Sequence, residues 1–153
     1  AVACAQRHCI SLIDMEGGEP PRTIGSALGN SGEGQLNFPV DVLFTPDGKD
    51  LVVADCHNKR VLVLGLDGAF VRQIPVGEHV QAVAMDTAGN IIAATRKNVK
   101  VFSPDGTLLH NRLGGLSMKW GGYGSLVVDP ITGRIAMGDQ GAGRVHCLIY
   151  MRT

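Results

Sequence analysis

A unit of about forty residues repeats along this chain of 153 residues, and few folds accommodate such a period. Three turn glycines mark it, at spacings of 41 and 44 residues: Gly48, Gly89 and Gly133. An apolar run precedes each glycine, and another run follows it. Short apolar runs joined by Asp-Gly turns are typical of β-hairpins. The repeat therefore predicts an array of short antiparallel strands.

The best-formed copy contains four apolar runs, at residues 40–44, 51–54, 61–64 and 70–74. Counting runs over the whole chain predicts three, four, four and three strands. Four short strands in each repeat of this length are the signature of a β-propeller blade. We therefore expect an all-β fold, a β-propeller fragment of about 3.5 four-stranded antiparallel blades. The expected single partial domain, 1–153, comprises the end of a blade (1–24), two blades (25–75 and 76–113) and the start of a blade (114–153).

A second pattern marks the turn between the second and third strands of a unit. Asp55 precedes Arg60 by five positions, and Asp139 precedes Arg144 by the same interval. Such a pair can be structural, with the carboxylate accepting backbone N–H groups and pairing with the guanidinium. It can also be an exposed pair that binds a ligand. Its recurrence favours the structural role, because a catalytic group is rarely needed once in every blade.

The copy at residues 34–74 resembles an NHL repeat. The resemblance lies in Gly34, Phe38, Pro39, Asp47, Gly48, Ala54, Asp55, Asn58, Arg60 and Val61. NHL propellers usually close with about six blades, so the resemblance implies a ring completed by missing blades or by another chain. It also implies a protein-interaction or scaffold module, and some members of the family bind RNA. Related six-bladed propellers include lactonases and amidating lyases that hold a divalent metal.

Charge is distributed unevenly over the predicted turns, although 14 basic and 14 acidic residues cancel. In a four-stranded meander, the first and third turns lie on one side, and the second turn and the connection to the next blade lie on the other. The first side collects nine carboxylates against two cations, and the second collects eight cations against four carboxylates. Turn chemistry explains the acidic side, because Pro-Asp-Gly turns favour Asp. The second side is the predicted basic face.

We expect the basic face to bind a partner, since a focused positive surface attracts acidic protein segments and nucleic-acid phosphates. A solvated rim without a partner is the alternative. The candidate binding residues are Arg7, His57, Lys59, Arg60, Arg96, Lys97 and Arg144. A protein or acidic peptide is the expected partner, and RNA is the second hypothesis. A metal-dependent, lactonase- or lyase-like enzyme is the third.

The residues give little support to catalysis. None of the common catalytic or nucleotide-binding motifs is present. The predicted inner strands offer Asp41, Gln81 and Ser125, which do not resemble a set of metal ligands. We therefore expect a chain that is not an enzyme and that uses no metal and no cofactor.

The cysteines lack the C-x-x-C spacing of a structural zinc site. Buried or half-buried thiols are the expected state of all four: Cys4, Cys9, Cys56 and Cys147. No stretch of 18 apolar residues occurs, so no membrane partner is expected. The first residues do not form a signal peptide. A cytoplasmic location is expected, unless a signal peptide has been lost upstream.

Overall fold

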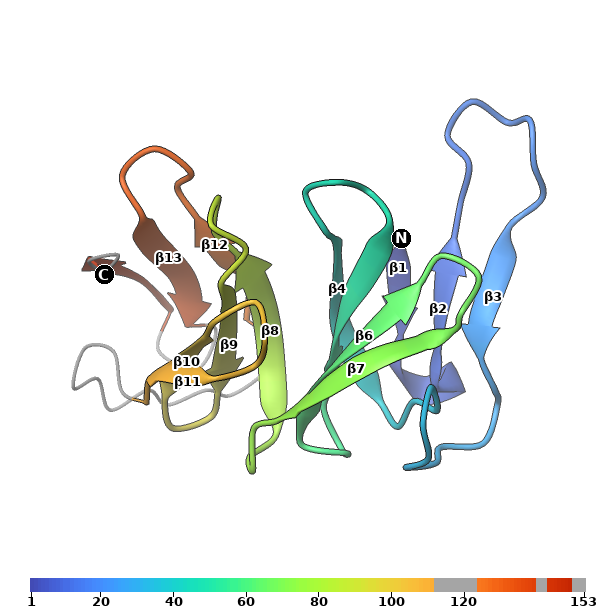
Figure 1. Cartoon of the computed structure of the whole chain (residues 1–153), viewed down its shortest axis with the longest axis horizontal. Helices are drawn as coiled ribbons and strands as arrows, with labels where there is room; N and C mark the ends of the chain where they lie inside the picture. Colours follow the sequence, from blue (N-terminus) through green and yellow to red (C-terminus); the bar gives the residue numbers. More distant parts are fainter. Residues whose placement is uncertain (112–123, 140–142, 150–153) are drawn as a thin grey trace. The chain divides into compact units, whose positions relative to one another are not determined.

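The computed structural model describes residues 1–111, 124–139 and 143–149, and these ranges contain fourteen strands and one 3₁₀ turn (Figure 1). The strands form four antiparallel sheets of three, four, four and three strands. The predicted all-β fold with this succession of strands is therefore confirmed. No helix in the described residues is long and apolar enough to cross a membrane.

Two sheets belong to the first compact unit, Ala1–Val80. One has the order β1-β2-β3, with β1 Val2–Cys4, β2 Cys9–Leu12 and β3 Arg22–Gly25. The 3₁₀ turn η1, Ala5–Arg7, connects its first two strands. The other has the order β4-β5-β6-β7, with β4 Pro39–Phe44, β5 Asp50–Asp55, β6 Arg60–Gly65 and β7 Phe70–Pro75. Strands adjacent in sequence are adjacent in both sheets, which is the meander of a propeller blade.

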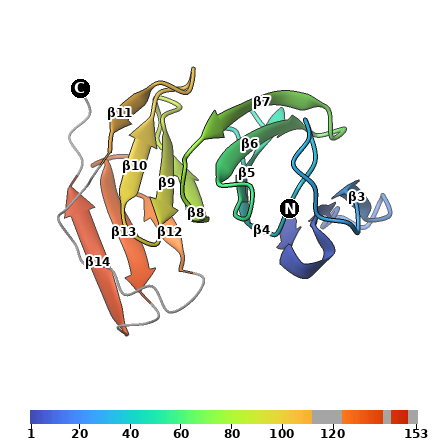
Figure 2. The ribbon, with the colours of Figure 1, turned by 90° about the horizontal axis from the view of Figure 1, so that it is seen from below.

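The second compact unit, Gln81–Thr153, contains the other two sheets, except that β8 starts one residue earlier (Figure 2). The four-stranded sheet comprises β8 Val80–Met85, β9 Ile91–Thr95, β10 Val99–Phe102 and β11 Leu108–His110. The three-stranded sheet comprises β12 Leu126–Val128, β13 Arg134–Asp139 and β14 Arg144–Ile149. Both sheets are again meanders.

Each unit has an apolar core between its two sheets, built by alternate residues of the strands. In the first unit, β5 and β6 supply four of the core side chains, and β2 and β3 supply two. Its buried members are Ile10, Ile24, Leu36, Leu51, Val53, Leu62 and Leu64. The core of the second unit comprises Ala82, Ala84, Ile92, Ala94, Val99, Val101, Leu126, Ile135 and Met137.

The register at the second turn confirms the internal alignment. The Cα atoms of Asp55 and Arg60 are partners at the end of β5 and β6. Asp139 and Arg144 are the equivalent partners of β13 and β14, and Cys4 and Cys9 are those of β1 and β2. Three residues connect β9 to β10, where four connect β5 to β6, and there Thr95 Oγ1 accepts the N–H groups of Lys97 and Asn98. A threonine hydroxyl thus replaces the carboxylate in the copy that lacks the pair.

Aspartates at the first and third turns hold the backbone of the hairpins. Asp47 Oδ1 accepts the hydroxyl of Thr45 at 2.7 Å, and Gly48 follows with φ of 69°. Asp105 accepts the hydroxyl of Ser103 and the N–H of Thr107. Hydrogen bonds of this kind lower the pKa of four carboxyls, those of Asp14, Asp47, Asp105 and Asp129. The acidic side predicted from the sequence therefore consists largely of aspartates whose hydrogen bonds hold the turns in place.

These turn aspartates are expected to make the free energy of unfolding depend on pH. A carboxyl whose pKa is lower in the folded chain stabilises it above the unfolded pKa of about 3.9, and this contribution is lost as pH falls through the folded value. We expect the unfolding free energy to decline below about pH 5. Asp105→Asn should show a shallower decline when urea unfolding is measured at pH 7 and pH 3. Equal declines in the variant and the parent chain would contradict this role for Asp105.

Candidate functional site

Asp55 and Arg60 form a buried ion pair at the second turn of the best-formed repeat. Arg60 Nε donates to Asp55 Oδ2 at 2.7 Å, and the two side chains are 7% and 0% exposed. Asp55 also accepts the backbone N–H of Asn37 at 2.7 Å and the amide of Asn58 at 2.8 Å. The carboxylate therefore fixes its own turn and also the loop before β4.

The guanidinium of Arg60 donates hydrogen bonds to several acceptors within the chain. Its terminal nitrogens donate to Gln73 Oε1 at 2.6 Å and to the carbonyl groups of Ser31, Gly32 and Gln35. The Asp55–Arg60 pair thus has the buried, hydrogen-bonded geometry that the structural role requires. The placement of Arg60 on an exposed binding face is wrong, because its donors are directed at the chain itself and the residue is 6% exposed.

Five of the other candidate residues lie on exposed turns. Arg7 belongs to η1, and His57 and Lys59 belong to the β5–β6 turn of the first unit. In the second unit, Arg96 and Lys97 occupy the β9–β10 turn. The side chains of Asp139 and Arg144 lie outside the part of the chain that the structure describes, so the roles predicted for this pair stay predictions.

The charged residues on the predicted basic face of the first unit do not by themselves make that face positive. The positive charge of Arg60 is compensated by buried Asp55. Arg7 and Lys59 are accompanied on the same side by Glu33 and Glu78. What distinguishes this side is the arrangement of its loops.

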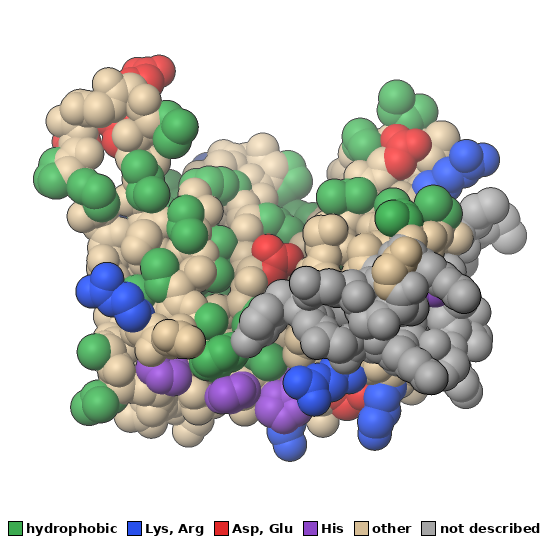
Figure 3. Space-filling view, turned by 180° about the vertical axis from the view of Figure 1, so that it is seen from behind, with side chains coloured by type: hydrophobic (Ala, Val, Ile, Leu, Met, Phe, Trp, Pro, Cys, Tyr) green, Lys and Arg blue, Asp and Glu red, His purple; other side chains and the backbone are tan. Residues whose placement is uncertain are grey.

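A cluster of aromatic and imidazole rings joins the loops of the first unit. His8 Nδ1 accepts the backbone N–H of Phe38 at 2.9 Å. The ring of Phe38 stacks on that of His57, with centroids 4.5 Å apart and planes 8° from parallel. His57 in turn meets His79 edge to face at 5.6 Å. We call His8, Phe38, Cys56, His57 and His79 the loop cluster; histidine side chains lie in a row along one edge in Figure 3.

The backbone around the loop cluster adopts an uncommon conformation. Three non-glycine residues among those described have positive φ: His8 at 50°, Phe38 at 57° and Lys59 at 54°. All three belong to loops that meet at the cluster. For a bulky residue such as Phe38 this conformation is costly and persists only where the surroundings enforce it. The hydrogen bond to His8 and the stacking on His57 provide that enforcement.

His57 lies in an environment that favours the neutral imidazole. Partial burial lowers its pKa, and the neighbouring His79 and His8 add to this effect, whereas the carboxylate of Asp55 opposes it. A neutral imidazole keeps one nitrogen lone pair available as a hydrogen-bond acceptor or metal ligand. The β5–β6 turn therefore presents an accessible imidazole, whose neutral form its surroundings favour, beside the cation of Lys59.

A thiol completes the loop cluster. Buried Cys56 places Sγ 3.7 Å from His79 Nδ1, and the carbonyl oxygen of Cys56 lies 3.1 Å from the same nitrogen. None of the four cysteines forms a disulfide bond. Cys4 is half-buried and Cys9 is buried, as expected, but Cys147 is exposed because it lies on β14 at the edge of its sheet.

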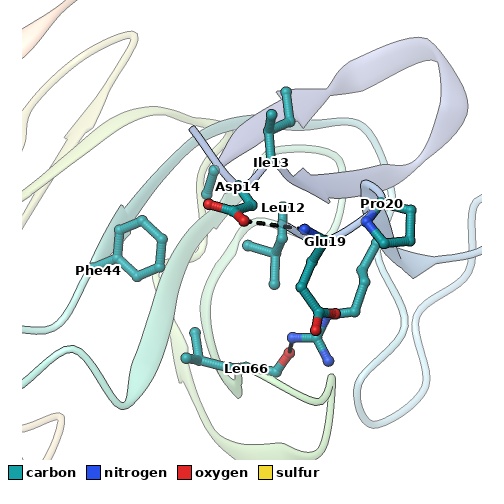
Figure 4. A pocket seen from close by; sticks show the side chains of 9 residues that line it. Leu12, Ile13, Asp14, Glu19, Pro20, Phe44 and Leu66 are labelled. Atoms are coloured by element: carbon teal, nitrogen blue, oxygen red, sulfur yellow. Dashed lines mark hydrogen bonds between the residues drawn. The ribbon is translucent and has the colours of Figure 1, made fainter. Parts of the chain in front are cut away.

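A separate pocket of about 330 Å³ lies in the first unit, at the opposite ends of the strands (Figure 4). Leu12, Phe44 and Leu66 give it a largely apolar wall. Asp14 accepts three backbone N–H groups of its own turn, and Arg22 donates to the carbonyl of Leu66 at 2.9 Å. Asp14 and Arg22 are thus engaged in hydrogen bonds to the backbone.

Comparison with known proteins does not place the chain in a family. No family model matches it, and no curated protein matches it. The blade-like meanders and the loop cluster are therefore the basis for any functional argument.

Proposed function

We propose that the chain is part of an NHL-type propeller and acts as a non-catalytic interaction module that binds a protein segment rich in carboxylates. The binding residues are Arg7, His57 and Lys59 in the first unit, and Arg96 and Lys97 supply a further basic turn in the second. The observation that carries the proposal is the convergence of three positive-φ residues on the loop cluster. Strained backbone of this kind gathers at functional sites, where it presents side chains in a fixed arrangement.

Several residues of the NHL-like repeat have clear structural roles that support the resemblance. Asp55, Asn58 and Arg60 form one hydrogen-bonded network. Pro39 begins β4 and is buried. The network leaves Lys59 and His57 exposed between its members. A rigid turn that presents a cation and an imidazole suits recognition, because little conformational entropy is lost when a ligand binds.

Reversal of the charge of Lys59 tests this proposal. The probe is a fluorescein-labelled oligoglutamate peptide, and its binding to the intact chain is followed by fluorescence anisotropy. Lys59→Glu and Arg7→Glu are each expected to weaken binding about fivefold to tenfold at low salt, because an attractive contact becomes repulsive. Lys49→Glu is the matched control, since Lys49 is exposed on the opposite turns.

Two results would contradict the proposal. One is the absence of measurable oligoglutamate binding, and the other is an equal loss with Lys49→Glu. An oligouridylate RNA measured in parallel examines the alternative. Tighter binding of the RNA, with a steep dependence on salt, would favour RNA recognition over binding of a protein segment.

A further inference from the structure

Three metal-ligating side chains meet in the loop cluster. The candidate ligand atoms of Cys56, His57 and His79 all lie within 4.8 Å of one another. They come from the β5–β6 turn and from the segment just before β8, and both belong to the first unit. Among the cysteine, histidine, aspartate and glutamate side chains of the described residues, these three are close enough together to bind one metal ion.

The separations are close to those of ligands that share one ion. Bond lengths of about 2.3 Å for Zn–S and 2.0–2.1 Å for Zn–N put the ligand atoms of a tetrahedral ion roughly 3.3–3.6 Å apart. The sulfur of Cys56 already lies 3.7 Å from Nδ1 of His79. Ligands up to 4.8 Å apart need to approach by roughly 1.2–1.5 Å, which rotations of the histidine side chains provide.

The surroundings orient two of the ligands. His79 Nδ1 lies 3.1 Å from the carbonyl oxygen of Cys56 and 3.7 Å from its Sγ, so contacts with Cys56 hold this imidazole beside the thiol. Stacking on Phe38 fixes the plane of His57.

His8 is excluded as a fourth ligand. Its Nδ1 accepts the N–H of Phe38, so the proton of the neutral ring is on Nε2 and no lone pair is available. The cluster thus offers three protein ligands and leaves the fourth position to a water molecule. Three protein ligands plus water is the arrangement of zinc sites that exchange ligands.

We propose that Cys56, His57 and His79 bind a Zn²⁺ ion. A thiolate with two imidazoles is a borderline-soft donor set, which suits zinc and disfavours magnesium and calcium, whose ligands are oxygens. Binding displaces the proton of the Cys56 thiol to solvent, and the thiolate and the two neutral imidazoles donate electron pairs to the ion. The site is distinct from the peptide-binding proposal in its chemistry, although His57 belongs to both.

Zinc binding to the intact, reduced chain tests the proposal. Equilibrium dialysis is expected to give one Zn²⁺ per chain. Cys56→Ser and His79→Asn should each weaken binding more than about 100-fold, because loss of a supporting group alone costs 10–100-fold. Cys4→Ser is the matched control, since Cys4 is a thiol of the same unit outside the cluster. Circular dichroism of every variant separates a lost ligand from a lost fold.

Cobalt provides a second measurement. Co²⁺ bound to the parent chain should show a thiolate-to-cobalt absorption band, and Cys56→Ser should abolish this band while His79→Asn alters the d–d bands. Full stoichiometric zinc binding by folded Cys56→Ser, or no zinc binding by the parent chain, would overturn the site. Oligoglutamate binding by Cys56→Ser is measured alongside, because this variant removes no cation and so separates failure of the zinc site from failure of the peptide site.

Discussion

Asp55→Ala is expected to destabilise the chain by about 3–5 kcal/mol, the largest effect among the substitutions considered. The variant leaves the guanidinium of Arg60 without its anionic partner in a site where the residue is 6% exposed. It also removes the acceptor of the Asn37 N–H and of the Asn58 amide. An uncompensated buried charge costs far more than the loss of a surface ion pair.

Urea unfolding followed by circular dichroism measures this effect. Lys49→Ala is the control, because the ion pair of Lys49 with Asp47 is 3.9 Å long and exposed, and its loss is expected to cost no more than about 1 kcal/mol. The double variant Asp55→Ala, Arg60→Met should recover part of the loss, since neither charge remains buried. If Asp55→Ala and Lys49→Ala proved equally stable, the buried pair would not have the structural role described here.

Leu62→Ala is expected to cost about 2–5 kcal/mol. Leu62 lies on β6, is fully buried, and belongs to the core between the two sheets of the first unit. Truncation removes transfer free energy and leaves a cavity that the strands of two sheets can fill only in part.

The same urea titration measures this second loss. Leu28→Ala is the control, because Leu28 is 80% exposed in the first unit and its truncation should change stability by no more than about 0.5 kcal/mol. A similar midpoint for both leucine variants would mean that the core between the two sheets contributes little.

The strands were predictable because their signal is local and repeated. Alternating apolar residues and Asp-Gly turns recur with the period of the blade, so each copy supports the assignment of the others. The alignment of Asp55 with Asp139 and of Arg60 with Arg144 predicted their cross-strand register for the same reason. The position of a residue in the repeat thus predicts its partner on the neighbouring strand.

The burial of Arg60 and the loop cluster were not predictable in this way. The carbonyl acceptors of Arg60 belong to Ser31, Gly32 and Gln35, which are not among the residues of the NHL resemblance. The cluster combines His8, Phe38, His57 and His79, which are separated by unequal intervals and meet only after two sheets have packed together. A search for C-x-x-C spacing could not find such ligands, because it examines neighbours in sequence.

The hydrogen bonds of the loop before β4 are expected to slow the exchange of its amide hydrogens with solvent. The N–H of Asn37 donates to the Asp55 carboxylate, and the N–H of Phe38 donates to the His8 ring. The carbonyl of Asn37 accepts the N–H of His57. A backbone amide exchanges with solvent deuterium only when its hydrogen bond opens. Here the loop is anchored both to the ring of His8, which follows η1, and to residues at the β5–β6 turn. The loop should therefore exchange with the slow, cooperative behaviour of a strand, although it pairs with none.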